Sequence, residues 1–189
     1  MSKAGEILDT LGEASAAESV SVGEINERVG HRGTGALLAV PAALELTPIG
    51  AVPGVPTAIA LVIALVAVQV ALGREDMWLP DWIARRSVSG TTLRGAVHTL
   101  RRAAAWSDRH LGRHLHVLVD GPAPRVAAIA ILALCATVPP LELVPFASSL
   151  PMAAIILFGL ALLTRDGRVM AVAWAAFAGA AFGLWALWP

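Results

Sequence analysis

Two carboxylates occupy the positions in this sequence that most favour chemistry. Glu45 is the only ionisable side chain between Gly33 and Leu72, and Glu142 is the only carboxylate in residues 126–164. A carboxylate surrounded by lipid is costly unless it is neutral, paired or hydrated. Two interpretations follow. Either the carboxylates form a proton- or substrate-linked pair near a pseudo-symmetry axis, or they cap short helices at the outer headgroup level.

Each carboxylate lies in a Leu-Glu-Leu-x-Pro sequence that interrupts an apolar run, at residues 44–48 and 141–145. The second break is expected to open at Pro139 and Pro140. Proline and glycine cannot continue a regular helix, so we expect them to shape the two breaks. As an alternative, free backbone groups at the breaks face a substrate. The break residues are Pro48, Pro53, Gly54, Pro56, Pro145 and Pro151.

The elements around the two carboxylates follow the same order, which predicts an internal duplication. In residues 33–73 and again in residues 126–168, an apolar helix, a break and a second apolar helix lead to an Arg followed by an acid. These helices are shorter than the ~20 residues that a membrane span needs, so the two hairpins are either spanning or re-entrant. The predicted helices cover residues 34–46, 57–72, 126–138 and 152–163.

The composition places these hairpins in a membrane. The chain is 57% hydrophobic with a mean hydropathy of +0.70, whereas a soluble domain is usually about 45–50% apolar. Residues 169–189 carry no Asp, Glu, Lys, Arg or His and are expected to be the only run long enough to span alone. The acidic N-terminus lacks the apolar run of a secretory signal. The predicted fold is therefore an all-α integral membrane protein with two broken hairpins and a C-terminal transmembrane helix.

Two polar segments flank the first hairpin. Residues 1–32 are acidic and predict a short amphipathic helix, followed by a second helix that a capping box of Ser21 and Glu24 would open. Residues 74–125 contain nine Arg against five acids, and their apolar residues recur at helical spacing over residues 91–119. We expect this amphipathic segment to lie at the membrane interface. Its predicted contacts with anionic lipid headgroups are Arg94, Arg101, Arg102, Arg109 and Arg113.

The distribution of basic residues predicts the orientation. Lys and Arg gather at the open ends of the hairpins and are missing from both breaks. Because basic residues favour the cytoplasmic side, the N-terminus, residues 74–125 and the turn at Arg165 are expected there, with the C-terminus outside. The two hairpins are then parallel repeats. Inverted repeats, common in transporters, remain the alternative.

The sequence contains no motif that would indicate an enzyme. It has no Gly-x-Ser-x-Gly, phosphate loop, His-Glu-x-x-His or Cys-x-x-Cys sequence. His110 and His114 are four residues apart, but no motif fixes a third ligand, so we expect solvated histidines and no metal. Cys135 is the only cysteine and is expected to be a small core residue. A net charge of zero and a membrane tether argue against nucleic acid as a partner.

Several stretches together resemble the ExoD family of bacterial membrane proteins, named for exopolysaccharide synthesis. They are residues 29–38 (Val-Gly-His-Arg-Gly-Thr-Gly-Ala-Leu-Leu), the proline-rich break at residues 48–56, Leu72-Gly73-Arg74, Trp78-Leu79-Pro80 and residues 163–167 (Leu-Thr-Arg-Asp-Gly). The resemblance runs from about residue 20 to the end and rests on pattern and order. It implies an inner-membrane protein linked to exopolysaccharide production and supplies no catalytic residues. His31 stands where the resemblance leads us to expect an acid.

The sequence thus predicts a non-enzymatic, polytopic inner-membrane protein that takes part in exopolysaccharide production, as assembly or export support. We expect membrane lipids and a second copy of the chain, in a homodimer, as its partners, together with the polysaccharide synthesis machinery. No cofactor is expected. The alternative function is a proton-coupled or lipid-linked substrate transporter that uses Glu45 and Glu142.

Overall fold

The structure is a computed structural model, and it describes most of the chain outside the segments around residues 25–33, 111–118 and 143–146. The described residues are 3–14, 16, 19–21, 23–24, 34–47, 50, 52–74, 78, 80–85, 87–110, 119, 121–142 and 147–187.

The described chain is built from helices, which confirms the predicted all-α class. One short antiparallel ribbon, with Val20 opposite Val88, was not expected from the sequence. The elements in chain order are α1 (Lys3–Ala14), β1 (Ser19–Ser21), α3 (Thr34–Glu45), α4 (Val55–Ala71), α5 (Asp81–Ala84), β2 (Ser87–Ser89), α6 (Gly90–His110), α7 (Ala123–Leu141), α8 (Ser149–Thr164) and α9 (Gly167–Leu187).

The helix α7 differs from the prediction at both ends. Pro139 and Pro140 were expected to open the second break, but they lie in the last turn of α7, which ends at Leu141. Proline has a helical φ and lacks only the amide N–H, so the end of a helix can accommodate it. The prediction that only residues 169–189 are long enough to span is therefore wrong. Among the described residues, α7 is the one helix long and apolar enough to cross a membrane.

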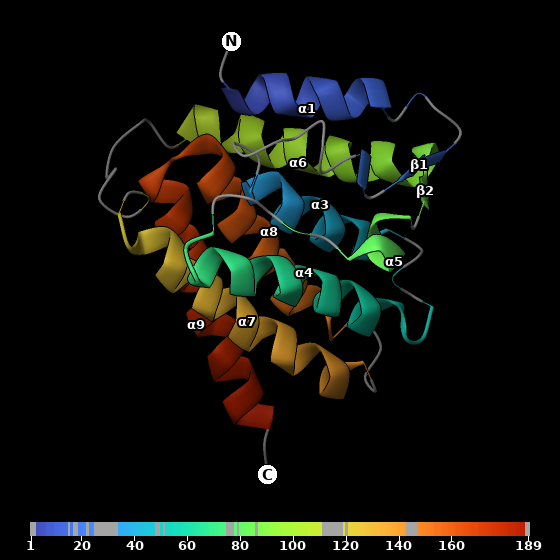
Figure 1. Ribbon diagram of the computed structural model, residues 1–189. Helices are drawn as coiled ribbons and strands as arrows, with labels where there is room; N and C mark the ends of the chain where they lie inside the picture. The colour runs from blue at the N-terminus through green and yellow to red at the C-terminus, as the bar shows by residue number, and fades with distance from the viewer. Residues whose placement is uncertain are drawn as a thin grey trace.

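The four hairpin helices pair mainly across the two predicted repeats. The most extensive helix contacts join α3 to α8 and α4 to α7, ahead of those within either hairpin. Both cross-repeat pairs are antiparallel, because Gly35 near the start of α3 lies against Gly159 late in α8, and Arg125 at the start of α7 lies against Gly73 after α4. Figure 1 shows the result: α3 and α7 run in one direction, α4 and α8 in the other.

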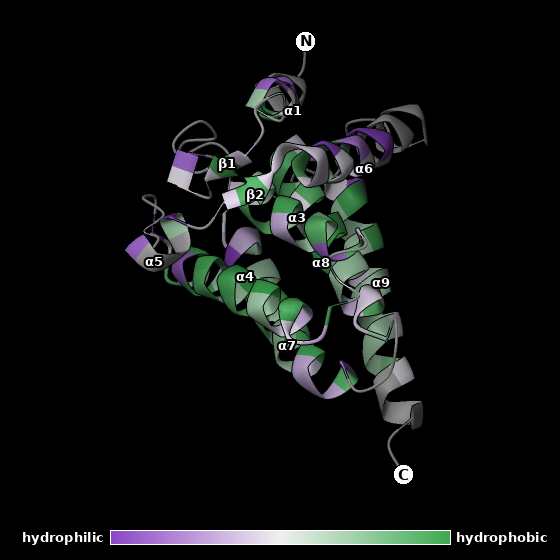
Figure 2. Ribbon diagram, turned by 90° about the vertical axis from the view of Figure 1, so that its right-hand side faces the viewer, coloured by the Kyte–Doolittle hydropathy of each residue, from purple (hydrophilic) through white to green (hydrophobic). Residues whose placement is uncertain are grey.

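These pairs form layers with different surfaces. Helix α6 packs on α3 and α8, α1 packs on α6, and α9 packs on α8 (Figure 1). Hydrophilic residues gather on α1 and α6, whereas α4 and α7 on the opposite side are hydrophobic along most of their length (Figure 2). The apolar stripe of α6 is turned inward, because Leu93, Ala96 and Leu100 are fully buried. The fold therefore has one polar side and one apolar side.

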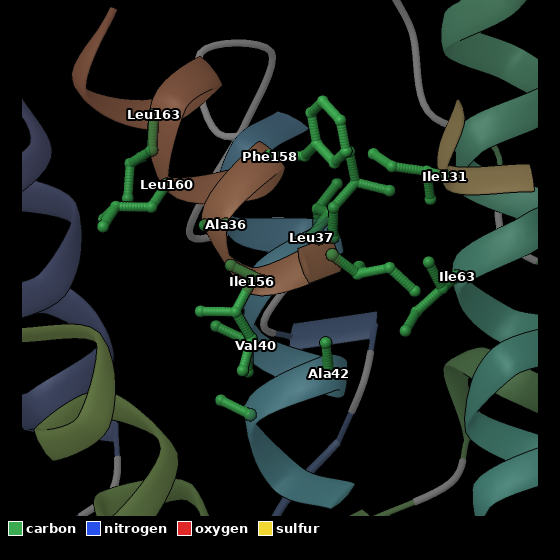
Figure 3. Packing of buried hydrophobic residues seen from close by; sticks show 14 of the residues in the cluster. Ala36, Leu37, Val40, Ala42, Ile63, Ile131, Ile156, Phe158, Leu160 and Leu163 are labelled. Carbon is green, nitrogen blue, oxygen red and sulfur yellow. The ribbon is translucent and has the colours of Figure 1, made fainter. Parts of the chain in front are cut away.

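The core lies between the two middle helices. Most residues of α3 and α8 are buried, and Ile63 of α4 and Ile131 of α7 point toward Leu37 and Phe158 (Figure 3). The two middle helices approach so closely that a Cβ on Gly159 would lie 2.7 Å from the carbonyl oxygen of Gly35. Glycine is therefore required at this crossing for lack of space. Phe158 continues the core toward α9 through edge-to-face contacts with two aromatic residues of that helix.

Candidate functional site at the helix breaks

The carboxylate Glu142 caps a helix of the opposite hairpin. It directly follows α7, and its oxygens accept hydrogen bonds from the backbone N–H of Gly54 and the hydroxyl of Thr57 at the start of α4. Helix α4 has no cap of its own, since Gly54 has no side chain and Pro56 has no N–H. Glu142 therefore supplies, from 88 residues away, the acceptor that the start of α4 lacks.

The same contacts set the charge state of Glu142. The Thr57 hydroxyl and the backbone N–H groups of Gly54 and Thr57 hold the pKa of the Glu142 carboxyl below its ordinary value. The positive end of the α4 helix dipole acts in the same direction. Glu142 is thus an ionised helix cap at ordinary pH.

Glu45 occupies the corresponding place in the other cross-repeat pair. It is the last residue of α3 and lies at the start of α8, where Ser148 donates its hydroxyl to Oε1 at 2.7 Å. Glu45 is only 4% exposed, and its Oε2 has no hydrogen-bond partner among the described residues. Gly50 lies so close to the carbonyl of Glu45 that no side chain would fit there. At Gly50 the chain therefore lies against the backbone of Glu45.

The structure brings both predicted carboxylates to one end of the bundle, with some of the predicted break residues. Gly54 has a left-handed backbone with φ +86°, Pro53 is exposed, and Pro56 is buried in the first turn of α4. Pro151 is buried in the first turn of α8. Pro48 and Pro145 lie outside the described residues. The sequence located the carboxylates but could not show that each one contacts the opposite hairpin.

A buried amide at the other end of α4 was missed by the sequence analysis. Gln69 is 6% exposed and binds the segment after the helix, accepting from the N–H of Trp78 at 2.7 Å and donating to its carbonyl at 2.9 Å. In a third hydrogen bond, the Gln69 side chain donates to the carbonyl of Leu65. Gln69 thereby fixes an exposed tryptophan beside the apolar helix. Its signal was available in the sequence as the only amide within an otherwise apolar helix.

The predicted Arg face of α6 is shared with α1. Arg101 donates to Asp9 of α1 at 2.7 Å, and both side chains are about half exposed. Arg94 and Arg102 are exposed on the same helix. The side chain of Arg109 and the whole of Arg113 lie outside the description, so headgroup contact by the five arginines stays a prediction.

Other candidate groups give no site in the part of the chain that is described. His98 is exposed on α6, and no group of three or more His, Cys, Asp or Glu within the described residues could hold a metal ion. The His110 side chain and His114 lie outside those residues. Cys135 is a free, buried thiol in α7, in agreement with its predicted role as a core residue.

The geometry defines a class of protein: an all-helical fold in which Glu142 caps α4 and Glu45 contacts the start of α8, beneath a polar layer made of α1 and α6. The particular family follows from comparison with known proteins. The chain matches the family described as "Exopolysaccharide synthesis, ExoD" over residues 4–186, and it belongs to that family.

One curated relative is Protein ExoD of Rhizobium meliloti (strain 1021), which is 31% identical over 158 residues. The match covers 81% of this chain and 64% of the relative, so the chain spans less than two thirds of that protein. No solved structure matches the chain. The resemblance predicted from the sequence is thus confirmed at the level of the family.

Proposed function

We propose that this chain is a non-enzymatic inner-membrane protein that supports the assembly or export steps of exopolysaccharide production. The link to exopolysaccharide comes from the family and from the name of the relative. The membrane location rests on one observation about the surface. Every exposed residue within α4, and every exposed residue of α7 after Arg125, is apolar.

This apolar surface is unlike that of a helix facing water. On α4 the exposed residues include Leu61 and Val68, and on α7 they include Val126 and Ile129. Helices at a protein–water boundary normally turn charged residues outward. The last helix, α9, also exposes a large apolar side chain, Phe182, which is 66% exposed. Lipid contact accounts for this arrangement without leaving polar groups in hydrocarbon.

The position of α6 favours re-entrant hairpins over four full spans. Helix α6 lies alongside α3 and carries the exposed Arg94 and Arg102. If α3 crossed the bilayer perpendicular to its plane, these arginines would be held at hydrocarbon depth, which is expensive. Insertion of the α4–α7 side alone leaves α1 and α6 in water.

Charged substitutions on the two sides of the fold test this location. Leu61→Glu on α4 is expected to remove the protein from the membrane fraction or to abolish its accumulation, because it places a carboxylate in lipid. The matched control, Thr91→Glu on the exposed surface of α6, is expected to leave membrane association and complementation of an exopolysaccharide-deficient strain unchanged. Equal membrane association of both variants would refute the proposed insertion.

A homodimer remains part of the proposal. Ala176 and Ala180 of α9 pack against the core of the chain itself, whereas Ala171, Ala175 and Gly179 are exposed small residues on the other side of the helix, a feature that permits close helix packing in membranes. Chemical crosslinking at Ala171→Cys in membranes, with Ala176→Cys as the comparison, tests which side of α9 meets a second copy.

A second candidate function is proton-coupled or lipid-linked transport through Glu45 and Glu142. The observation that favours it is the buried Glu45 oxygen without a partner among the described residues. In this case Glu45→Gln abolishes complementation at normal expression, and purified protein in liposomes gives a pH-dependent flux. A scaffold gives no flux and co-purifies with a synthase through residues 74–125. Full activity of Glu45→Gln would refute the transport role.

A further inference from the structure

The carboxylates Glu45 and Glu142 have unequal surroundings although their positions correspond. Glu142 is partly exposed and receives hydrogen bonds from one hydroxyl and two backbone N–H groups. Glu45 is buried and receives one hydrogen bond, from the hydroxyl of Ser148. An ionised carboxylate has about four acceptor sites, so Glu45 in that form would leave most of its capacity unused. The cost of a buried, unsatisfied charge is far larger than that of a neutral group.

The end of α3 also disfavours a negative charge at Glu45. As the last residue of the helix, Glu45 lies among the final carbonyl groups, which carry the negative end of the helix dipole. Thr47 uses one of these carbonyls, that of Leu44, through its N–H and its hydroxyl. The remaining carbonyls favour a protonated carboxyl group over an ionised one, in opposition to the positive end of α8, which favours the ionised form.

Within the described residues, the side-chain partner of Glu45 is a neutral hydroxyl and not a positive charge. From α8 the contact is the neutral Ser148, and from α6 the nearby residue is Gly95, which lies against Thr47. The charged or titratable residues near that part of α6, Arg94 and His98, are exposed. The second break adds Glu142, a like charge, at the same end of the bundle.

We infer that Glu45 is a proton-binding site: the folded protein holds one proton on this carboxyl group, and none on Glu142. The ligand is a proton because Oε2 is enclosed by protein and has no donor among the described residues. The protonated group accepts from Ser148 through Oε1 and carries its proton on the enclosed Oε2. The corresponding carboxylate, Glu142, serves as an ionised helix cap.

This inference assigns the proton of the proposed proton-coupled transport to one residue, Glu45. It rests on the proposed function only in assuming that the protein lies in a membrane. Proton occupancy of Glu45 can be read directly, without an activity assay. The inference about Glu45 can therefore fail in a protein whose complementation succeeds. It can also be correct in a protein that acts only as a scaffold.

Infrared spectroscopy of the purified protein in lipid vesicles at neutral pH tests the inference. The wild-type protein is expected to show the C=O band of a protonated carboxylic acid, which carboxylates do not give. Glu45→Gln is expected to remove this band and to fold normally, because the amide has the shape of the neutral acid. Glu142→Gln, the matched control, is expected to keep the band.

Ser148→Ala provides a second variant that retains the carboxyl group. Loss of the hydroxyl donor is expected to shift the band without removing it. The inference is overturned if the wild type lacks the band, if Glu45→Gln retains it, if Glu142→Gln loses it, or if Ser148→Ala leaves it unmoved. Failure of Glu45→Gln to fold would also overturn it, since that result would require a charge at this position.

Discussion

Substitution of Gly35 tests whether the α3–α8 crossing holds the fold together. A Cβ at this position would clash with the carbonyl oxygen of Gly159 and lie 2.5 Å from the backbone N of Leu163. The second distance is about 0.9 Å shorter than the 3.4 Å at which ordinary contact begins. Both neighbours are backbone atoms of a buried helix, so no side chain can rotate away. The two central helices must therefore separate.

The size of the effect follows from two opposing terms. Overpacking a core costs typically 1–3 kcal/mol, and a backbone clash belongs at the upper end of about 3 kcal/mol. Alanine recovers at most about 1 kcal/mol of helix propensity. We expect Gly35→Ala to lose about 2 kcal/mol, which for a chain of this length lowers the melting temperature by about 4–8 °C.

Thermal unfolding in mild detergent, followed by tryptophan fluorescence, provides the measurement. Gly179→Ala is the matched control, because a Cβ at that exposed position of α9 would meet no atom within 4 Å. The control is expected to melt at or above the wild-type temperature. A Gly35→Ala protein as stable as the control would show that the two helices do not approach as closely as described.

Three further outcomes follow from the contacts at the helix ends. Glu142→Gln is expected to lower the melting temperature at neutral pH, because the start of α4 loses an ionised cap. The difference in melting temperature from the wild type should disappear in acid, because folding lowers the pKa of Glu142. The ionised carboxylate therefore stabilises the fold above the pKa of the unfolded chain, about 4.3. This stabilisation is lost as the pH falls through the pKa of the folded protein. Gln69→Leu is expected to cost about 1–3 kcal/mol and to expose the chain around Trp78 to proteolysis, because two backbone groups lose their partner. Leu11→Ala, at a fully buried position of α1, should cost about 2–5 kcal/mol, whereas Asp9→Asn should cost under about 1 kcal/mol since its ion pair is half exposed.

Each of these outcomes can be contradicted by a specific result. A pH-independent difference for Glu142→Gln would mean that charge does not matter to the cap. Unchanged proteolysis of Gln69→Leu would show that the amide does not hold Trp78. Hydrogen exchange in α1 that rises more for Asp9→Asn than for Leu11→Ala would show that the ion pair, not the buried leucine, retains this helix.

The sequence predicted the local elements better than their partners. Helices α3, α4 and α8 lie within a few residues of their expected positions, because apolar runs and Pro/Gly breaks are local signals. Pairing of α3 with α8 is set by space at Gly35 and Gly159, which no periodicity reveals. Pro139 was misjudged because proline was treated as a helix terminator rather than as a residue with a helical φ.

The same limit applies to the candidate site. Glu45 and Glu142 were found because a carboxylate in an apolar run is costly and therefore conspicuous. Their different environments could not be predicted, since Ser148 and Thr57 reach them only after the hairpins have come together. Gln69 was overlooked because an uncharged amide hardly disturbs the hydropathy of its helix, although it binds the backbone of Trp78 on both sides.

The capping of α4 by Glu142 has a consequence for how the chain is made. Gly54 leaves the ribosome 88 residues before Glu142. At 5–20 residues per second, this interval is roughly 4 to 18 s. Throughout it, the first hairpin has an uncapped helix and no second middle helix beside α3. The first hairpin therefore gains its cap and its main packing partners only when the second hairpin has been made.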